Sequence, residues 1–341
     1  MLNRIYRLVE PHTIEPVEQQ AVIGADTVVV RPTYLSICNA DQRYYQGRRS
    51  ARAMAKKLPM ALIHEGIGEV VYDARGKLAP GAQVVMLPNN PTETDDCIAE
   101  NYLESSQFCG SGFDGFMQEL CFLPASRVLE LPHGIDPRVA AFTELVSVAM
   151  HAVTRFDSIA HERRETVGVW GDGNVGFIVS LVLHMLFPDM RLFVFGRKSY
   201  KLADFTFVER TFLTSNIPDD VRVDHAFECC GGEGAAHAIE QIIDYIRPEG
   251  AVSLLGVSEN PVPVNTRMVL EKGLRLFGSS RSGRADFERT LELYEANPQM
   301  VDYLQALVGN VVDVESVRNI ATAFDIDVRK QMGKTIMKWE M

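Results

Sequence analysis

The feature that most restricts the fold of this chain is the glycine pattern in TVGVWGDGNVGFIVSLV, where Gly171, Gly173 and Gly176 separate strand-forming residues from an apolar helical run. The first glycine permits a tight turn, and the second lets the backbone approach a pyrophosphate. The third lets the helix pack against its strand, with the anion at the helix N-terminus. An ordinary strand-to-helix turn is the alternative. The order of strand, turn and helix favours a dinucleotide site, in which Asn174 and Val175 complete the loop.

The end of the next expected strand, in RLFVFGRKSYK, indicates which dinucleotide is bound. NAD-binding units carry an acidic residue about 20 residues after the glycines, which accepts hydrogen bonds from the ribose 2′-hydroxyl, whereas a 2′-phosphate requires a cation. Here Gly196 is followed by Arg197 and Lys198, with Lys201 close behind, and no carboxylate is present. The pattern predicts NADP(H), although a solvated basic turn is the alternative.

The expected strands and helices divide the chain at about residue 145. Residues 20–145 contain short β-branched runs separated by Pro, Gly and Asn, so this part is expected to be mainly β. Beyond it, strands alternate with helical segments, which predicts crossover connections and a parallel sheet. A chain of 341 residues fits two domains, at roughly 150 residues for each.

Composition and charge argue against several classes of protein. The formal net charge of -11 argues against a nucleic-acid surface, which needs a basic face. No run resembles a signal peptide or a bilayer-spanning helix, so we expect no membrane insertion and a cytoplasmic location. The cysteines lack the spacing of a disulfide scaffold and are expected to be reduced. They are Cys38, Cys97, Cys109, Cys121, Cys229 and Cys230.

Four residues in the first part of the chain carry side chains that a catalytic zinc accepts. Cys38 follows an expected strand, His64 and Glu65 stand together in ALIHEGIGEV, and Glu144 opens the helical run FTELVSVAMHA. Thiolate, imidazole and carboxylate are all zinc ligands. The gaps between them are long, and a buried free cysteine is usually just a small apolar residue. The residues alone therefore leave both a metal site and an ordinary core open.

Taken together, these features resemble the zinc-dependent medium-chain dehydrogenase/reductase family. The cysteine after a strand, the His-Glu-Gly run with a second glycine at Gly68, the glutamate before the second domain and the glycine motif follow the family order. The match extends along essentially the whole chain. More narrowly, the runs CNADQRYY, LPMALIHEGIGEVV, PNNPTETDD, WGDGNVG, DHAFECCGG and GSSRSG are similar to the ribulose-5-phosphate reductases that supply ribitol 5-phosphate for bacterial teichoic acid and capsule.

The resemblance implies an α/β fold with two domains. A GroES-like, mainly-β catalytic domain would span 1–144 and be completed by 285–341, and a Rossmann NADP-binding domain with a doubly wound parallel sheet would span 145–284. It further implies NADPH and one catalytic zinc, held by Cys38, His64 and Glu144, with Glu65 as an adjacent carboxylate that binds the metal or moves away. Relatives commonly form homodimers, and a cytidylyltransferase would consume the product.

Several departures from the family pattern stand out in the sequence. The glycine that usually precedes the His-Glu pair is Ile63, and the usual Gly-Asp-Arg-Val in the following strand is GAQV at 81–84. Residues 88–121 contain only Cys97, Cys109 and Cys121, so no structural zinc is expected. Ala40 stands where relatives often carry the hydroxyl that starts a proton relay.

The resemblance implies reduction of D-ribulose 5-phosphate to D-ribitol 5-phosphate, in which the substrate phosphate needs cations. Arg43, with Tyr44 beside it, follows the zinc cysteine closely, and Lys57 and Arg281 are further candidates. Each of these is individually also explained as an ordinary surface charge. The alternative functions are an NAD(P)-dependent polyol dehydrogenase acting on an unphosphorylated sugar alcohol, and a non-catalytic NADPH-binding sensor.

Overall fold

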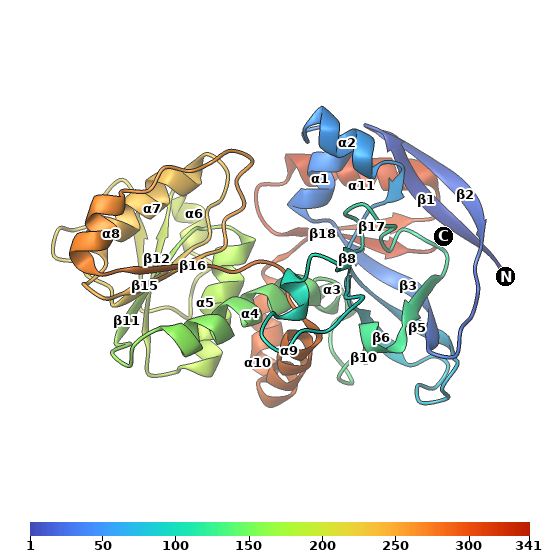
Figure 1. Cartoon of the computed structure of the whole chain (residues 1–341), viewed down its shortest axis with the longest axis horizontal. Coiled ribbons are helices and arrows are strands. Elements are labelled where there is room, and N and C mark those ends of the chain that lie inside the picture. The colour runs from blue at the N-terminus through green and yellow to red at the C-terminus, as the bar shows by residue number, and fades with distance from the viewer. The chain divides into compact units, whose positions relative to one another are not determined.

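The computed structural model describes residues 1–341 (Figure 1). The chain forms two compact units, Met1–Glu144 with Ser282–Met341, and Leu145–Arg281. The expected return to the first unit, at residue 285, lies slightly later than the structural one, because α9 (Arg284–Ala296) belongs entirely to the first unit. No helix combines the length and apolar character needed to cross a bilayer.

The first unit is mainly β, as its short β-branched runs predict. Its largest sheet has the order β10-β6-β5-β3-β18-β17, with β9 paired to β3, and a smaller sheet has the order β2-β1-β4. β17 and β18 run parallel, and the pairings of β3 are antiparallel. The strands are β1 (Leu2–Glu10), β2 (Thr13–Gln20), β3 (Thr27–Ser36), β4 (Met60–Ala61), β5 (Glu65–Asp73), β6 (Gln83–Met86), β7 (Asn89–Asn90), β8 (Gln107–Phe108), β9 (Cys121–Pro124), β10 (Val128–Glu130), β17 (Val308–Val314) and β18 (Lys334–Trp339).

The carboxyl-terminal segment completes this first unit. Its strand β18 pairs with β3, so residues from the two ends of the chain share one apolar core. Phe324, for example, stacks on Tyr45 with ring centroids 4.3 Å apart. The helices of this unit are α1 (Asn39–Tyr45), α2 (Ala51–Lys57), α3 (Pro137–Ala140), α9, α10 (Pro298–Gln305) and α11 (Val317–Arg329), with short 3-10 turns at Glu100–Tyr102 and Ala125–Arg127.

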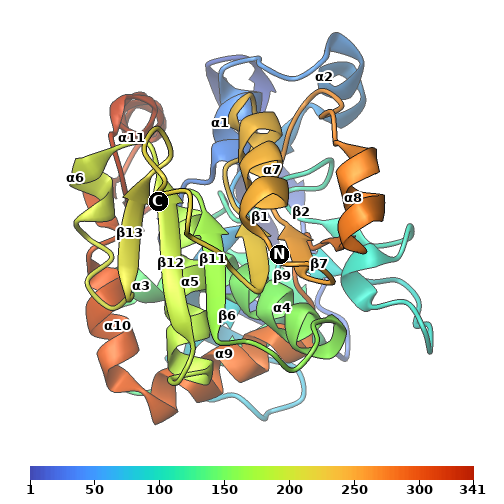
Figure 2. The same ribbon diagram turned by 90° about the vertical axis from the view of Figure 1, so that its left-hand side faces the viewer.

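The second unit contains a six-stranded parallel sheet of order β13-β12-β11-β14-β15-β16. Numbered within the unit, this is the 3-2-1-4-5-6 order of a dinucleotide-binding fold. Every residue of β11 and β14 is buried, as expected for parallel strands covered by helices on both faces. Figure 2 turns β11, β12 and β13 toward the reader. The strands are β11 (Thr166–Trp170), β12 (Arg191–Gly196), β13 (Arg210–Leu213), β14 (His225–Glu228), β15 (Ala251–Leu254) and β16 (Arg275–Gly278).

The helices of the second unit connect these strands. They are α5 (Asn174–Leu186), α6 (Ser199–Leu202), α7 (Gly234–Tyr245) and α8 (Thr266–Lys272). A longer helix, α4 (Thr143–Ile159), begins with the last two residues of the first unit and continues into the second. The helical run predicted at FTELVSVAMHA is therefore present.

Candidate functional site

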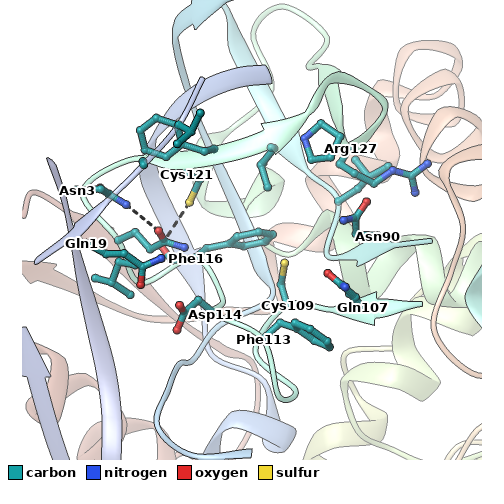
Figure 3. Close-up of a pocket in the computed structure, with 18 of the residues that line it drawn as sticks. Asn3, Gln19, Asn90, Gln107, Cys109, Phe113, Asp114, Phe116, Cys121 and Arg127 are labelled. Carbon is teal, nitrogen blue, oxygen red and sulfur yellow. Dashed lines mark hydrogen bonds between the residues drawn. The ribbon is translucent and has the colours of Figure 1, made fainter. Parts of the chain in front are cut away.

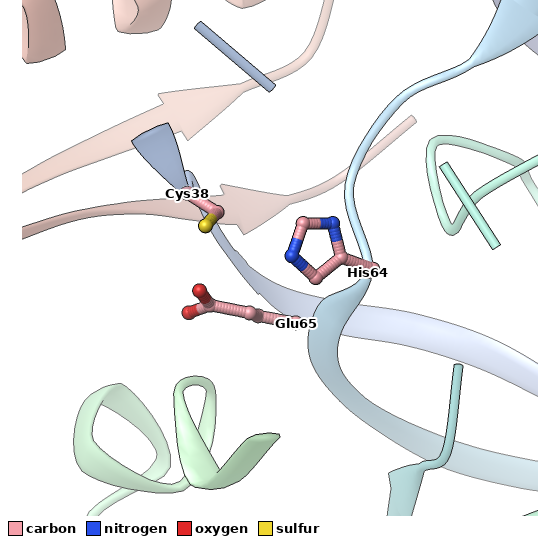
Figure 4. Close-up of side chains that lie close together, drawn as sticks. All are labelled: Cys38, His64 and Glu65. Atoms are coloured by element: carbon pink, nitrogen blue, oxygen red, sulfur yellow. The ribbon is translucent and has the colours of Figure 1, made fainter. Parts of the chain in front are cut away.

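Three of the four predicted metal ligands meet in the first unit. β3 and β5 are antiparallel neighbours with Ser36 opposite Glu65, so the residues that extend these strands, Cys38 and His64, are brought together. The ligand atoms of Cys38, His64 and Glu65 all lie within 4.8 Å of one another. Figure 4 shows the thiol, the imidazole and the carboxylate turned toward a common space. Residues separated by 26 positions in sequence thus form one buried cluster because of strand pairing.

The carboxylate of Asp41 connects the two segments that carry these ligands. Its Oδ2 accepts the backbone N–H of Cys38 at 3.0 Å, at the start of α1, and its Oδ1 accepts the N–H of Ile63 at 3.0 Å. The same Oδ1 lies 3.4 Å from Nδ1 of His64. Burial lowers the pKa of His64, but Asp41 and Cys38 outweigh that effect and raise the pKa well above its ordinary value.

Glu65 is held by two partners that the sequence analysis did not single out. Lys334 on β18 donates from Nζ to Glu65 at 2.8 Å, and Ser36 donates from Oγ at 2.7 Å. Both charged groups are almost fully buried. Burial lowers the pKa of Lys334, but Glu65 and then Cys38 more than offset that and raise it above its ordinary value. The carboxylate next to His64 thus has a fixed counter-ion in Lys334.

Glu144 is buried on the first turn of α4 but does not belong to the three-residue group. Its charge interacts with His64, Glu65 and Lys334, which places it beside the cluster. Burial raises the pKa of Glu144 to about 7. Its direct contact with a metal therefore stays a prediction.

The cluster fits a transition metal such as zinc. It offers a thiol, an imidazole and a carboxylate, which is the donor set that zinc accepts. Nδ1 of His64 faces the carboxylate of Asp41 at 3.4 Å, which leaves the other ring nitrogen for a metal. These observations support a metal site rather than an ordinary apolar core.

The glycine turn of the second unit has the geometry that its sequence predicts. Gly171 has φ +141°, and a Cβ on Gly176 would lie 1.9 Å from the carbonyl oxygen of Gly171, so no side chain fits at the third position. A Cβ on Gly173 would meet nothing within 4 Å, so this backbone is open to a ligand. α5 begins at Asn174 directly after it, followed by Val175. The cradle suits a pyrophosphate at a helix N-terminus.

The predicted cations lie at the end of the neighbouring strand. Arg197 and Lys198 directly follow β12 and are exposed, while Lys201 lies half-buried on α6. The backbone N–H groups of Arg197 and Lys198 both donate to Asp172, a residue inside the glycine motif that the sequence analysis overlooked. The sequence does carry a signal for Asp172, because an acidic residue is unexpected in a loop that binds an anion.

The structure brings together two of the four phosphate candidates. Nζ of Lys57 donates to the hydroxyl of Tyr44 and to Ser111 Oγ, both at 2.8 Å. Arg43 lies on α1 beside Tyr44. Arg281 is the last residue of the second unit.

A cavity beside Cys109 and Cys121 of the first unit is a separate feature. Its volume is about 370 Å³, and Cys109, Phe113, Phe116, Cys121 and Arg127 are among its lining residues (Figure 3). None of the predicted site residues lines it. All six cysteines of the chain are free.

Known proteins match this chain over its whole length. The alcohol dehydrogenase GroES-like domain matches residues 24–133, and the glucose dehydrogenase C-terminus matches residues 137–337. The ribulose-5-phosphate reductase of Bacillus spizizenii is 54% identical over 341 residues, covering 100% of both chains. The chain belongs to the medium-chain dehydrogenase/reductase family. This confirms the expected family and its α/β fold.

Other medium-chain dehydrogenases and reductases are similar to a comparable extent. Ribulose-5-phosphate reductase 1 of Staphylococcus aureus is 50% identical over 341 residues, with 100% of both chains covered. The crystal structure of S. aureus TarJ in complex with NADPH superposes with a TM-score of 0.90 at 45% identity, again covering 100% of both chains.

The structure shows how Ile63, one departure from the pattern of medium-chain dehydrogenases, is accommodated. Ile63, which replaces the usual glycine before the His-Glu pair, has φ 71°, in the left-handed region that glycine adopts without strain. A β-branched residue there is a true outlier. The surroundings hold it in place, because its N–H donates to Asp41 and its carbonyl accepts the N–H of Phe116 at 2.8 Å.

Proposed function

We propose that this chain catalyses the NADPH-dependent, zinc-assisted reduction of D-ribulose 5-phosphate to D-ribitol 5-phosphate, a precursor of ribitol teichoic acid or capsule. The observation that carries this proposal is the end-to-end similarity, at 54% identity, to a ribulose-5-phosphate reductase. The NADPH complex of the S. aureus relative supports the cofactor, as do Arg197 and Lys198 at the place where a 2′-phosphate requires cations.

The buried cluster would hold the metal and prepare the carbonyl for reduction. Cys38, His64 and Glu144 would bind zinc, with Glu65 beside it as the carboxylate that binds or moves away. When bound, zinc supplies Lewis-acid polarisation of the C2 carbonyl, and NADPH supplies the hydride. Glu65 starts from its ion pair with Lys334, so any movement toward the metal must break a buried contact.

The proton needed for the alcohol cannot come from residue 40. Ala40 has no hydroxyl, so the relay expected in relatives has no first member here. Glu65 is paired with Lys334. Water at the site, oriented by Glu65 or Glu144, would then deliver the proton.

The substrate phosphate would bind at Lys57 and Tyr44, with Arg43 nearby. One loop supports this assignment, because it contacts both the metal cluster and Lys57. A Cβ on Gly110 would lie 3.5 Å from Nδ1 of His64, and the next residue, Ser111, is bonded to Lys57. Neighbouring Cα atoms are only about 3.8 Å apart. This loop supports a phosphate position near the metal cluster, as a phosphate separated from the carbonyl by C3, C4 and C5 requires.

The first test compares substrates and cofactors on protein whose zinc content has been measured. We expect rapid oxidation of NADPH with D-ribulose 5-phosphate and little with D-ribulose or with NADH. Equal rates on D-ribulose would favour the polyol dehydrogenase. Absence of turnover together with tight NADPH binding would favour the sensor.

The second test addresses the phosphate residues. Lys57→Met removes the cation, and we expect kcat/KM for D-ribulose 5-phosphate to fall by about tenfold or more, mainly through KM. Lys56→Met is the matched control, because it removes an exposed lysine from the same helix. If both variants behave alike, the phosphate does not bind at Lys57.

Three further expectations belong to this proposal. The enzyme would act as a homodimer, which light scattering can test. Its product would pass to a cytidylyltransferase. A cytoplasmic location agrees with six free cysteines, since oxidising compartments favour disulfides.

A further inference from the structure

Asp172 occupies an unusual place in the dinucleotide turn. It lies between Gly171 and Gly173, where the chain is expected to receive a pyrophosphate. Its Oδ2 accepts the N–H of Arg197 at 2.7 Å and the N–H of Lys198 at 2.8 Å. The side chain therefore joins the turn after β11 to the turn after β12, the neighbouring parallel strand. Two hydrogen bonds to one carboxylate oxygen fix the backbone of both cationic residues.

The same side chain fills the space next to Gly196. A Cβ on Gly196 would lie 2.6 Å from the Cβ of Asp172 and 2.9 Å from its Oδ2. It would also lie 2.8 Å from Cδ2 of Leu202. The Asp172 contact involves a Cβ atom, which cannot move without its backbone. Residue 196 is the last residue of β12, where an NAD-binding unit carries its ribose-binding acid.

The charges around the turn agree with this arrangement. Arg197 and Lys198 are exposed, so their side chains can reach a ligand. Oδ2 of Asp172 is already committed to two backbone donors. Burial raises the pKa of the Cys230 thiol to about 12, with Asp172 raising it further and Arg197 lowering it, so these charges are close together.

We propose that Asp172 is a specificity-determining positioning residue for the dinucleotide: it holds the backbone of Arg197 and Lys198 for a 2′-phosphate and excludes an NAD-type carboxylate at residue 196. This inference rests on the proposed use of NADPH. In the opposite role, Asp172 itself would accept a hydrogen bond from a ribose 2′-hydroxyl. The two roles predict opposite changes in the affinity for a 2′-phosphate when the Asp172 carboxylate is removed.

The experiment measures binding to the full-length protein by isothermal titration calorimetry, with adenosine 2′,5′-bisphosphate and AMP as probes. For Asp172→Ala we expect affinity for the bisphosphate to fall by about tenfold and affinity for AMP to stay within about twofold. Asp172→Asn keeps an oxygen acceptor of the same size and should retain most of the binding. Asp204→Ala, which removes an exposed acid from the same unit, is the matched control.

A pair of variants tests the exclusion at residue 196, with NADPH and NADH as the probes. Gly196→Asp alone should weaken both cofactors by about tenfold or more, because Asp172 occupies the space. Combined with Asp172→Gly, the same change should restore NADH binding above that of the single variant. Circular dichroism would establish that each protein is folded.

Several results would overturn the inference. They are unchanged or tighter bisphosphate binding in Asp172→Ala, and a Gly196→Asp variant that binds NADH as well as the double variant does. None of these measurements uses the sugar phosphate. If the probes behave as expected but D-ribulose 5-phosphate is not reduced, the proposed reaction fails and the role of Asp172 stands.

Discussion

Each unit of the molecule buries a glutamate and a histidine, and the comparison between them shows two ways of stabilising such groups. In the metal cluster, Glu65 is paired with Lys334, and His64 lies beside Asp41. In the dinucleotide-binding unit, backbone N–H groups of three residues donate to Glu228, and His225 is bonded only to main-chain groups.

The two histidines respond in opposite directions. Asp41 and Cys38 overcome burial and raise the pKa of His64, whereas burial, with His161 nearby, lowers the pKa of His225 to about 4. Side-chain partners can exchange when a metal or a proton arrives, but peptide groups are fixed by the fold. We conclude that the first arrangement can respond to a ligand and the second holds a strand end rigid.

The largest expected effect comes from removing a member of the side-chain cluster. Cys38→Ser should lose bound zinc and lower turnover by more than about 100-fold, because a hydroxyl is a poor zinc ligand. Metal analysis and initial rates provide the measurement. Cys97→Ser, at an exposed cysteine of the same unit, should change neither. Full activity of Cys38→Ser would remove this thiol from the site.

The next effect concerns stability. Lys334→Met leaves Glu65 as an unpaired buried charge and should lower the free energy of unfolding by about 3–5 kcal/mol. Urea denaturation measures it, and Lys338→Met on the same strand, exposed, should cost less than about 1 kcal/mol. Adding Glu65→Gln to Lys334→Met should recover part of the loss. Additive losses in the double variant would contradict the pairing.

A smaller loss is expected for the glutamate surrounded by peptide groups. Glu228→Gln replaces one carboxylate oxygen by an N–H₂ group that faces backbone donors, which should cost about 1–3 kcal/mol. Zinc content should not change. Glu240→Gln, on the exposed side of α7, is the control for the change of charge. A loss equal to that of Lys334→Met would erase the contrast between the two units.

The smallest effect is a dependence of stability on pH. In the unfolded chain a histidine takes up its proton near pH 6.5, and His225 in the folded chain does so only near 4. The unfolded state therefore binds more protons between these values, and stability falls as the pH is lowered through this window. At pH 6 the loss is less than about 1 kcal/mol, even before solvent screening is considered.

His225→Asn should remove this dependence. An asparagine can still accept the N–H of Ala251, which His225 Nδ1 accepts at 3.0 Å, but it does not titrate. The measurement is the difference in unfolding free energy between the two proteins at several pH values. A difference that stays constant from pH 7 to pH 4 would show that His225 does not cause the effect.

Much of the fold and part of the site could be predicted from the sequence. The glycine motif, the cations after β12 and the alternation of strands and helices each depend on residues close together in the chain. Asp41, Asp172 and Lys334 were missed because their roles depend on contacts made only after folding. Lys334, for example, meets Glu65 across 269 positions when β18 pairs with β3. No spacing rule reports such a contact.

The carboxylate of Asp41 has a consequence for the order in which the active protein is assembled. It ties the start of α1 to the segment before His64 through main-chain hydrogen bonds, and neither bond involves a metal. The ligands are therefore brought together by folding itself, unlike those of a zinc finger, which needs its metal in order to fold. The polypeptide can mature first and acquire its metal afterwards, so a cell short of zinc would accumulate an intact protein ready to be activated.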